Sequence, residues 1–198
     1  MLKKGDIYRK VFHLGNMIFP LGYWFFISTK TEMIIITGSL LLLSVIIDVF
    51  RLKNDRLHQF FRRWLHVMMK TDEVEGRFTG ATWVMTGVFL TVILFQKEVA
   101  IPAMLFLSVG DSVAAIVGLK YGRIHIGKKT LEGSLAGFVS CLTVVAFYTD
   151  VSFFIRIMGA VTAMLVELFP IPIDDNVRIP VLSGAVMYGL YYFGCNVV

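Results

Sequence analysis

Residues 122–134, GRIHIGKKTLEGS, have the composition of a loop that binds phosphate. Lys128 and Lys129 supply positive charge to phosphate oxygens. Gly122 and Gly127 let backbone N–H groups approach the same oxygens. The spacing matches a Walker A motif as far as Lys128, but Lys129 then stands where that motif requires Ser or Thr. The segment therefore predicts a phosphate cradle that is not a soluble P-loop.

Acidic side chains and one histidine recur in or beside the apolar segments of the chain. A charge in hydrocarbon costs about 2.5–3.5 kcal/mol on insertion scales, so each of these residues needs a chemical reason. Asp111 lies deepest, about eight residues or 12 Å from the inner end of the apolar segment 99–119. All of them fall toward the same side, which predicts a pocket open to the cytoplasm. The set consists of His13, Asp48, Asp111, Glu132, Glu167, Asp174 and Asp175.

Carboxylates beside a phosphate loop predict a Mg²⁺ site, because proteins usually bind Mg²⁺ through one or two carboxylates together with phosphates. We expect Asp111 and Glu132 to hold the ion, with Asp174 as a further ligand. Asp175 is either another ligand or the base that accepts a hydroxyl proton, and His13 is an alternative base. Two structural interpretations stay open: the Asp174–Asp175 pair as a solvated turn, and His13 as a hydrogen-bonding residue inside a helix bundle.

The composition predicts the kind of scaffold that carries these residues. Of the 198 residues, 57% are hydrophobic and only 17% are charged, and the mean hydropathy is +0.74. Soluble domains have about 45–50% apolar and about 25% charged residues. The chain is therefore expected to be a polytopic membrane protein, an all-α helix bundle forming one domain over 1–198. A doubly wound soluble sheet is excluded.

Seven apolar segments approach the length of about 20 residues that crosses a bilayer core as a helix. Almost all basic residues outside these segments fall on one side, and only Lys30 and Lys97 lie on the other. By the positive-inside rule the N-terminus is cytoplasmic. This topology accounts for the net charge of +5 without nucleic-acid binding. The predicted spans are about 11–28, 32–50, 79–96, 99–119, 132–149, 151–168 and 179–197.

A separate amphipathic pattern occupies residues 54–70, where apolar residues recur at helical spacing and basic residues fill the remaining positions. It predicts a helix that lies in the cytoplasmic interface, or else a connecting helix packed on the bundle. Asp48 and Arg51, three positions apart, are expected to form a local ion pair. Arg156, within 151–168, is expected to extend outward from its helix.

Residues 99–149 are expected to form a tight hairpin of two helices. Small residues allow two helix backbones to approach closely, and both segments carry a stripe of them. The Gly-Lys loop would lie at the tip of this hairpin, with Thr130 at the start of the second helix. Glycine packing alone would not explain a carboxylate in the seam. The stripes are Ser108, Asp111, Ala115, Gly118 and Gly122 on the first segment, and Gly133 and Gly137 with Ser140 or Cys141 on the second.

The same region resembles the CTP-binding signature of the family that contains dolichol kinase, phytol kinase and CTP-dependent diacylglycerol kinase. Two weaker similarities flank it, at 9–15 and at 174–184. The resemblance thus covers nearly the whole chain. The matching positions are Asp111, Ala114, Gly118, Gly122, Lys128, Lys129, Thr130, Glu132, Gly133 and Ala136.

The resemblance implies phosphoryl transfer from CTP to a membrane lipid alcohol, such as phytol, a polyprenol, dolichol or diacylglycerol, with CDP as the second product. Mg²⁺ would accompany CTP, and the site would face the cytoplasm at the cell membrane. The residues that would bind the nucleotide are Lys128, Lys129, Thr130, Gly118, Gly122, Gly127 and Gly133.

Two alternatives remain. A relative of phosphatidate cytidylyltransferase would use a similar nucleotide and metal site but would release pyrophosphate. A small transporter would show internal repeats and polar groups near the bilayer midplane, and the sequence shows neither pattern. The acceptor and the oligomeric state are left open by the sequence.

Overall fold

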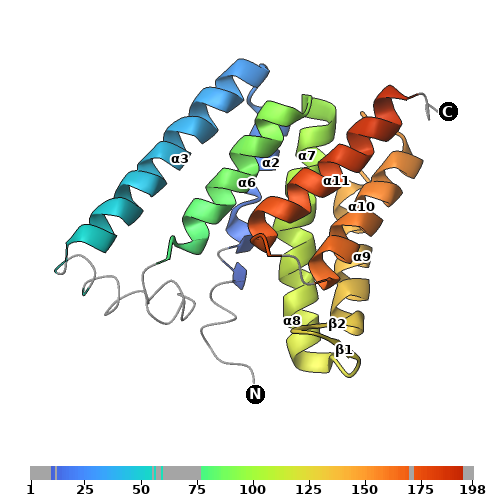
Figure 1. The fold of residues 1–198 in the computed structure, drawn as a ribbon. Coiled ribbons are helices and arrows are strands. Elements are labelled where there is room, and N and C mark those ends of the chain that lie inside the picture. The colour runs from blue at the N-terminus through green and yellow to red at the C-terminus, as the bar shows by residue number, and fades with distance from the viewer. Residues whose placement is uncertain are drawn as a thin grey trace.

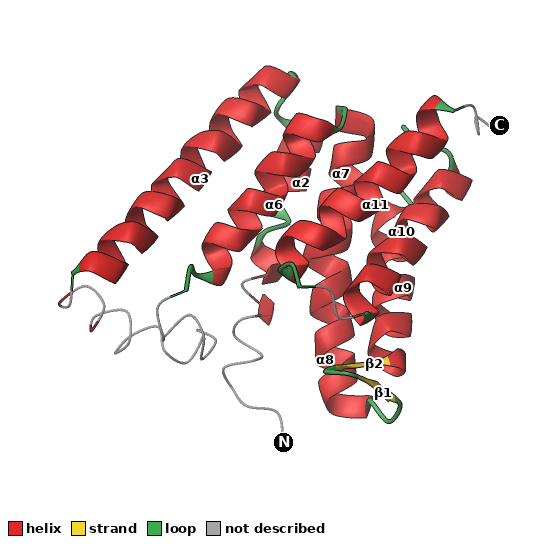
Figure 2. Cartoon of the chain, in the orientation of Figure 1, coloured by secondary structure: helices red, strands yellow, loops and turns green. Residues whose placement is uncertain are grey.

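The computed structural model describes residues 10, 11, 13–54, 56, 59, 77–169 and 172–193, and almost all of its ordered elements are helices (Figures 1 and 2). The prediction of an all-α architecture is confirmed, and each of the seven predicted segments contains a helix. The predicted helix 54–70 falls almost wholly outside the described residues. In chain order the elements are α2 (Ile18–Phe25), α3 (Lys30–Lys53), α6 (Gly80–Leu94), α7 (Lys97–Leu105), the π-helix η1 (Phe106–Gly110), α8 (Asp111–Tyr121), β1 (His125–Ile126), β2 (Lys129–Thr130), α9 (Leu131–Val145), α10 (Phe153–Leu168) and α11 (Asp175–Tyr192).

Two helical stretches are long and apolar enough to cross a bilayer: Lys30–Lys53 and the continuous run Lys97–Tyr121. Gly80–Leu94 and Leu131–Val145 are apolar but shorter. The number of spans and the direction of the N-terminus therefore stay predictions.

The run Lys97–Tyr121, formed by α7, η1 and α8, passes through the interior of the bundle, and most of it is buried. Helices α9, α10 and α11 pack beside this run, and α6 packs against α11. Helix α3 lies at the edge of the bundle and packs mainly against α6 (Figure 1). Its outer side exposes large apolar residues, as expected for a helix that faces lipid. They include Ile35, Ile36, Leu42, Leu43 and Phe50.

The predicted hairpin of 99–149 is present, with α8 and α9 packed closely along their lengths. Its seam contains the predicted Gly118, Gly122, Gly133 and Gly137. On the first segment it continues from Gly118 through Ala114 and Gly110 at a constant spacing of four, rather than through the predicted Ala115. Ridges of residues four apart pack in this way when they interdigitate. A Cβ atom added to Gly133 would lie 2.4 Å from the carbonyl oxygen of Ala114, and one added to Gly137 would lie 3.0 Å from the Ala114 Cβ.

The tip of this hairpin is a two-stranded antiparallel ribbon rather than an irregular loop. His125 pairs with Thr130 and Ile126 pairs with Lys129. Gly127 begins the turn with φ = 61°, a left-handed conformation that glycine adopts without steric cost. As predicted, Thr130 caps α9, since its hydroxyl oxygen accepts a hydrogen bond from the Gly133 N–H at 3.2 Å.

Three buried charged residues, Asp48, Arg51 and Arg156, have structural roles. The predicted pair is confirmed: Arg51 Nε donates to Asp48 Oδ1 at 3.1 Å, and Asp48 Oδ2 also accepts from the Thr79 N–H at 2.8 Å. This network ties the end of α3 to the start of α6. The structure assigns Arg156, which is 8% exposed, a role that the sequence left open. Its Nη1 donates to the carbonyl oxygens of Val145 at 2.6 Å and Ala146 at 3.1 Å, which satisfies acceptors at the end of α9.

Candidate functional site

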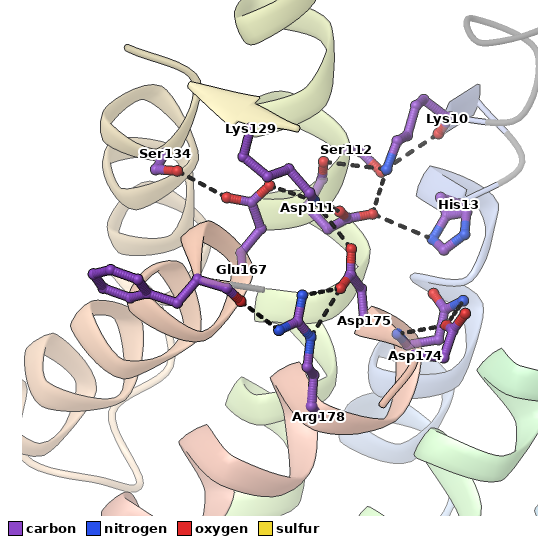
Figure 3. A network of polar contacts seen from close by, with 12 residues as sticks. Lys10, His13, Asp111, Ser112, Lys129, Ser134, Glu167, Asp174, Asp175 and Arg178 are labelled. Atoms are coloured by element: carbon purple, nitrogen blue, oxygen red, sulfur yellow. Dashed lines mark hydrogen bonds and ion pairs between the residues drawn. The ribbon is translucent and has the colours of Figure 1, made fainter. Parts of the chain in front are cut away.

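The ammonium group of Lys129 is surrounded by three carboxylates that come from three different helices (Figure 3). Its Nζ lies 2.6 Å from Glu167 Oε1, 3.0 Å from Asp175 Oδ2 and 3.6 Å from Asp111 Oδ1. Burial alone would lower the pKa of Lys129, but the carboxylates of Asp111, Asp175 and Glu167 outweigh that effect and raise the pKa above its usual range. The lysine is therefore a fixed positive charge at neutral pH.

The ribbon at the hairpin tip decides which of the two adjacent lysines enters this cluster. Successive side chains in a strand point to opposite sides of the ribbon. A residue in the turn does not follow this alternation. Lys129 is the first residue of β2 and reaches the cluster, with its side chain 24% exposed. Lys128 lies in the turn beside Gly127 and is exposed. The sequence alone had assigned both lysines the same role.

Asp111 forms the buried floor of the cluster. It is 2% exposed, and its Oδ2 lies 2.5 Å from Lys10 Nζ and 3.9 Å from His13 Nδ1. The described part of the N-terminal segment therefore lies against the start of α8, where Ser112 Oγ also lies within 3.4 Å of the Lys10 carbonyl oxygen. Asp111 directly follows η1, and π-helical turns shift the phase of a helix and are frequent at functional sites.

Glu167 comes from the last turn of α10 and is 2% exposed. Its two oxygens have separate partners, because Oε1 faces Lys129 and Oε2 accepts a hydrogen bond from Ser134 Oγ at 2.8 Å. Ser134 stands on the first turn of α9, so this bond joins α9 to α10. The sequence marked Glu167 as a buried charge but did not place it at the site.

Asp175 is the most open of the three carboxylates, with its side chain 30% exposed. It is the first residue of α11, which begins four residues earlier than predicted. Its Oδ2 faces Lys129, whereas its Oδ1 accepts hydrogen bonds from Nε of Arg178, at 2.8 Å, and from Nη2 of the same guanidinium. The cluster is therefore reached from the side of Asp175 and Lys129.

The structure brings together four of the predicted site residues: Asp111, Asp175, Lys129 and His13. Glu132 lies outside the cluster, because both of its carboxylate oxygens accept from the Ile124 N–H, at 3.1 and 3.2 Å. Asp174 caps α11, and its Oδ1 accepts from the backbone N–H and the side-chain Nδ2 of Asn176. Gly118, Gly122 and Gly133 pack within the hairpin, and Gly127 forms the turn.

Four cluster residues were not predicted as site residues: Lys10, Ser134, Glu167 and Arg178. Lys10 had a signal, since it belongs to the flanking similarity at 9–15. Glu167 had a weaker one, as a carboxylate inside an apolar helix. Arg178 lies within the flanking similarity at 174–184 but at one of its variable positions, and Ser134 had no signal, because a serine near small residues has an ordinary explanation.

The cluster combines three cations with three carboxylates, which are the kinds of group that bind phosphate oxygens and a metal ion respectively. Carboxylate oxygens are the ligands that Mg²⁺ prefers, and Asp111 Oδ1 is buried without a hydrogen-bond donor. Among the described residues, no group of three or more acidic, histidine or cysteine side chains is arranged to hold a metal by itself. A Mg²⁺ ion would thus take one or two carboxylates from the protein and the rest of its ligands from phosphates and water. The donor set fits that mode of binding.

Comparison with known proteins identifies relatives over most of the chain, although no protein-family model and no solved structure matches it. The chain is 35% identical over 183 residues to the uncharacterized protein RP860 of Rickettsia prowazekii, covering 87% of this chain and 88% of the relative. It is 26% identical over 232 aligned residues to CTP-dependent diacylglycerol kinase 1 of Saccharomyces cerevisiae, covering 94% and 73%. It is 29% identical over 160 residues to the protein of the same name in Schizosaccharomyces pombe, covering 71% and 73%.

Proposed function

Because the chain belongs to the family of CTP-dependent lipid kinases, we propose that it transfers the γ-phosphoryl group of CTP to the hydroxyl group of a membrane lipid alcohol. A bond forms between the lipid oxygen and the γ-phosphorus, the bond from that phosphorus to the β-phosphate oxygen breaks, and CDP leaves. Diacylglycerol is the first acceptor to test, since relatives are named for it. Phytol, polyprenols, dolichol and farnesol are the other lipid alcohols to test as acceptors.

The observation that carries this proposal is the convergence of three carboxylates on the ammonium group of one half-buried lysine (Figure 3). Phosphoryl transfer needs little covalent chemistry from the protein and depends mainly on positioning and on neutralising charge. A fixed cation can neutralise phosphate oxygens, and a carboxylate can hold the metal or accept the hydroxyl proton. In this cluster, Lys129 lies within hydrogen-bond distance of Glu167 and Asp175, and Lys10 within hydrogen-bond distance of Asp111.

The positions of the side chains suggest a division of roles. Lys129 and Lys10 would bind phosphate oxygens. Asp111 and Glu167, the two fully buried carboxylates of the cluster, would hold Mg²⁺ together. When bound, Mg²⁺ would neutralise charge on the phosphates of CTP. Asp175 is open to an approaching lipid and would accept the hydroxyl proton, with His13 as the alternative base.

The residues outside the cluster would act at its edge. Lys128, exposed at the hairpin tip, would attract CTP without reaching the reacting atoms. Glu132 and Asp174 would stabilise the loop and helix ends that carry Lys129 and Asp175. The glycines of the hairpin would allow α8 and α9 to approach and so hold Asp111 near Lys129.

The membrane would supply the acceptor. We place the chain in the cell membrane with the N-terminus and the cluster on the cytoplasmic side, in accord with the two membrane-length helices and the distribution of basic residues. CTP would then arrive from the cytoplasm while the lipid hydroxyl stays at the same interface.

The position of a radioactive label tests this function. Purified protein in detergent with Mg²⁺ is given one of the five lipid alcohols, or phosphatidate in a parallel reaction, together with CTP labelled on either the α- or the γ-phosphorus. We expect the lipid to become labelled only from γ-labelled CTP, with CDP as the other product. Label that enters lipid from the α position, with release of pyrophosphate, would identify a cytidylyltransferase. If none of the five lipid alcohols becomes labelled, the kinase function is wrong and the transporter becomes the leading alternative.

A further inference from the structure

Arg178 links α10 and α11, the two helices that carry Glu167 and Asp175 into the cluster. It lies on the first turn of α11 and is 6% exposed. Its Nε and Nη2 both donate to Oδ1 of Asp175, and its Nη1 donates to the carbonyl oxygen of Phe169 at 2.6 Å. Phe169 directly follows α10, the helix that carries Glu167.

This placement is electrostatically unusual for an arginine. The N-terminus of a helix carries a partial positive charge, so a cation in its first turn is disfavoured unless an anion compensates it. Here Asp175, three residues earlier on the same helix face, supplies that anion. The Phe169 carbonyl is one of the acceptors that the end of α10 leaves without a helical partner. Arg178 therefore joins Asp175, a carboxylate of the cluster, to the end of the helix that carries Glu167.

The arrangement of bonds divides the carboxylate of Asp175 between two tasks. Arg178 takes only Oδ1, and Oδ2 is left facing Lys129 at 3.0 Å (Figure 3). Because two donors of a planar guanidinium meet one oxygen, the carboxylate has little freedom to rotate. Without this hold, Oδ1 and Oδ2 could exchange and Asp175 could turn toward solvent, where 30% of its side chain is already exposed.

We propose that Arg178 is a positioning residue, which fixes Oδ2 of Asp175 toward the reacting groups and ties α10 to α11 without touching either substrate. This inference rests on the proposed kinase function and adds to it the residue that orients the proton-accepting carboxylate. Lysine should replace Arg178 only in part, because its ammonium group keeps the charge beside Asp175 but lacks the planar set of donors that reaches both Asp175 and the Phe169 carbonyl.

The test compares Arg178→Gln and Arg178→Lys with Arg156→Gln. Arg156 is a matched control, since it is also a buried arginine that caps a helix end, but it lies on the first turn of α10, far from the cluster along that helix. We expect Arg178→Gln to lower kcat at least tenfold while KM for CTP changes less than threefold, and Arg178→Lys to give an intermediate kcat. Arg156→Gln should lower the yield of folded protein and leave kcat per folded molecule unchanged.

Several results would overturn the inference. A tenfold rise in KM for CTP with unchanged kcat would mean that Arg178 binds the nucleotide itself. Equal kcat values for Arg178→Gln, Arg156→Gln and wild type, each per folded molecule, would leave Arg178 with a structural role only. A wild-type kcat for Arg178→Lys would show that the positive charge alone is enough and that the several donors of the guanidinium are not required.

A second measurement does not depend on activity. The unfolding equilibrium is measured for wild type, Arg178→Gln, Asp175→Asn and the double variant. If Arg178 holds Asp175, the change in the unfolding equilibrium constant of the double variant should differ at least fivefold from the product of the changes in the two single variants. A change equal to that product would contradict the contact. If the wild type transfers no phosphoryl group from CTP, the proposed function fails, and this cycle alone decides whether Arg178 holds Asp175.

Discussion

The contact between Lys129 and Glu167 should be measurable as a coupling free energy in the folded protein. Glu167→Gln keeps the shape of the side chain and an oxygen that can accept from Ser134, but it removes the charge that faces the ammonium group at 2.6 Å. Lys129→Met removes the ammonium group and keeps much of the apolar stem. A cycle of these two variants and their combination isolates the pair.

The structure sets the size of this coupling. A hydrogen bond between charged groups contributes about 1.5–3 kcal/mol to stability. Lys129 is 24% exposed and keeps Asp175 at 3.0 Å and Asp111 at 3.6 Å when Glu167 loses its charge. The remaining carboxylates compensate part of the loss, so we expect a coupling near the lower end, about 1–2 kcal/mol, or roughly a 5- to 30-fold change in the unfolding equilibrium constant.

The assay is reversible unfolding of the detergent-purified protein by a denaturing detergent, followed by tryptophan fluorescence. Lys128→Met is the matched control, because Lys128 is the neighbouring lysine but is exposed in the turn. Its coupling to Glu167→Gln should be near zero. A coupling below about 0.3 kcal/mol for Lys129, or an equal coupling for Lys128, would refute the geometry of the cluster.

Three further predictions concern the hairpin, the charge state of the cluster and the metal. Gly133→Ala should destabilise the protein by about 1–3 kcal/mol in thermal unfolding, because the new Cβ would lie 2.4 Å from the Ala114 carbonyl oxygen; Gly189→Ala, with no atom within 4 Å of its Cβ, should not, and equal losses would contradict the seam. Because the pKa of Lys129 is raised in the folded state, its contribution to stability is complete below the unfolded pKa of about 10.4 and is lost only as pH rises through the folded value. The difference in unfolding free energy between wild type and Lys129→Met should therefore be constant from pH 7 to pH 9, and a decline within that range would show that the lysine loses its proton there. Removal of Mg²⁺ with EDTA should abolish transfer from CTP and restore it on readdition, and transfer that persists in EDTA would exclude the metal site.

The sequence predicted the helices well, because long apolar segments and their polar breaks reflect the strongest physical constraint on the chain. It also predicted that 99–149 forms a glycine-lined hairpin with Thr130 as a helix cap. The predicted glycines Gly118, Gly122, Gly133 and Gly137 lie in the seam. The rest of the first segment differs, since the predicted spacing of three and four placed Ala115 at the contact instead of Ala114. The observed contact uses Gly110, Ala114 and Gly118, as two interdigitating i, i+4 ridges require.

The candidate site was partly predictable for a similar reason. Asp111, Asp175 and Lys129 stand in local patterns that suggest chemistry. Glu167 contacts a lysine 38 positions away, and local spacing cannot reveal such a contact. The choice between Lys128 and Lys129 depends on the strand pairing of a short ribbon, and a one-residue shift in that pairing would reverse it.

The most direct test of the central claim compares γ-phosphoryl transfer by wild type, Lys129→Gln and Lys128→Gln at saturating CTP. The cluster around Lys129 predicts that Lys129→Gln lowers kcat at least a hundredfold, equivalent to about 2.7 kcal/mol of transition-state stabilisation. Lys128→Gln should keep kcat within about threefold of wild type, or about 0.7 kcal/mol. Equal losses in the two variants, or a larger loss for Lys128→Gln, would contradict the claim that Lys129 and its three carboxylates form the reaction centre.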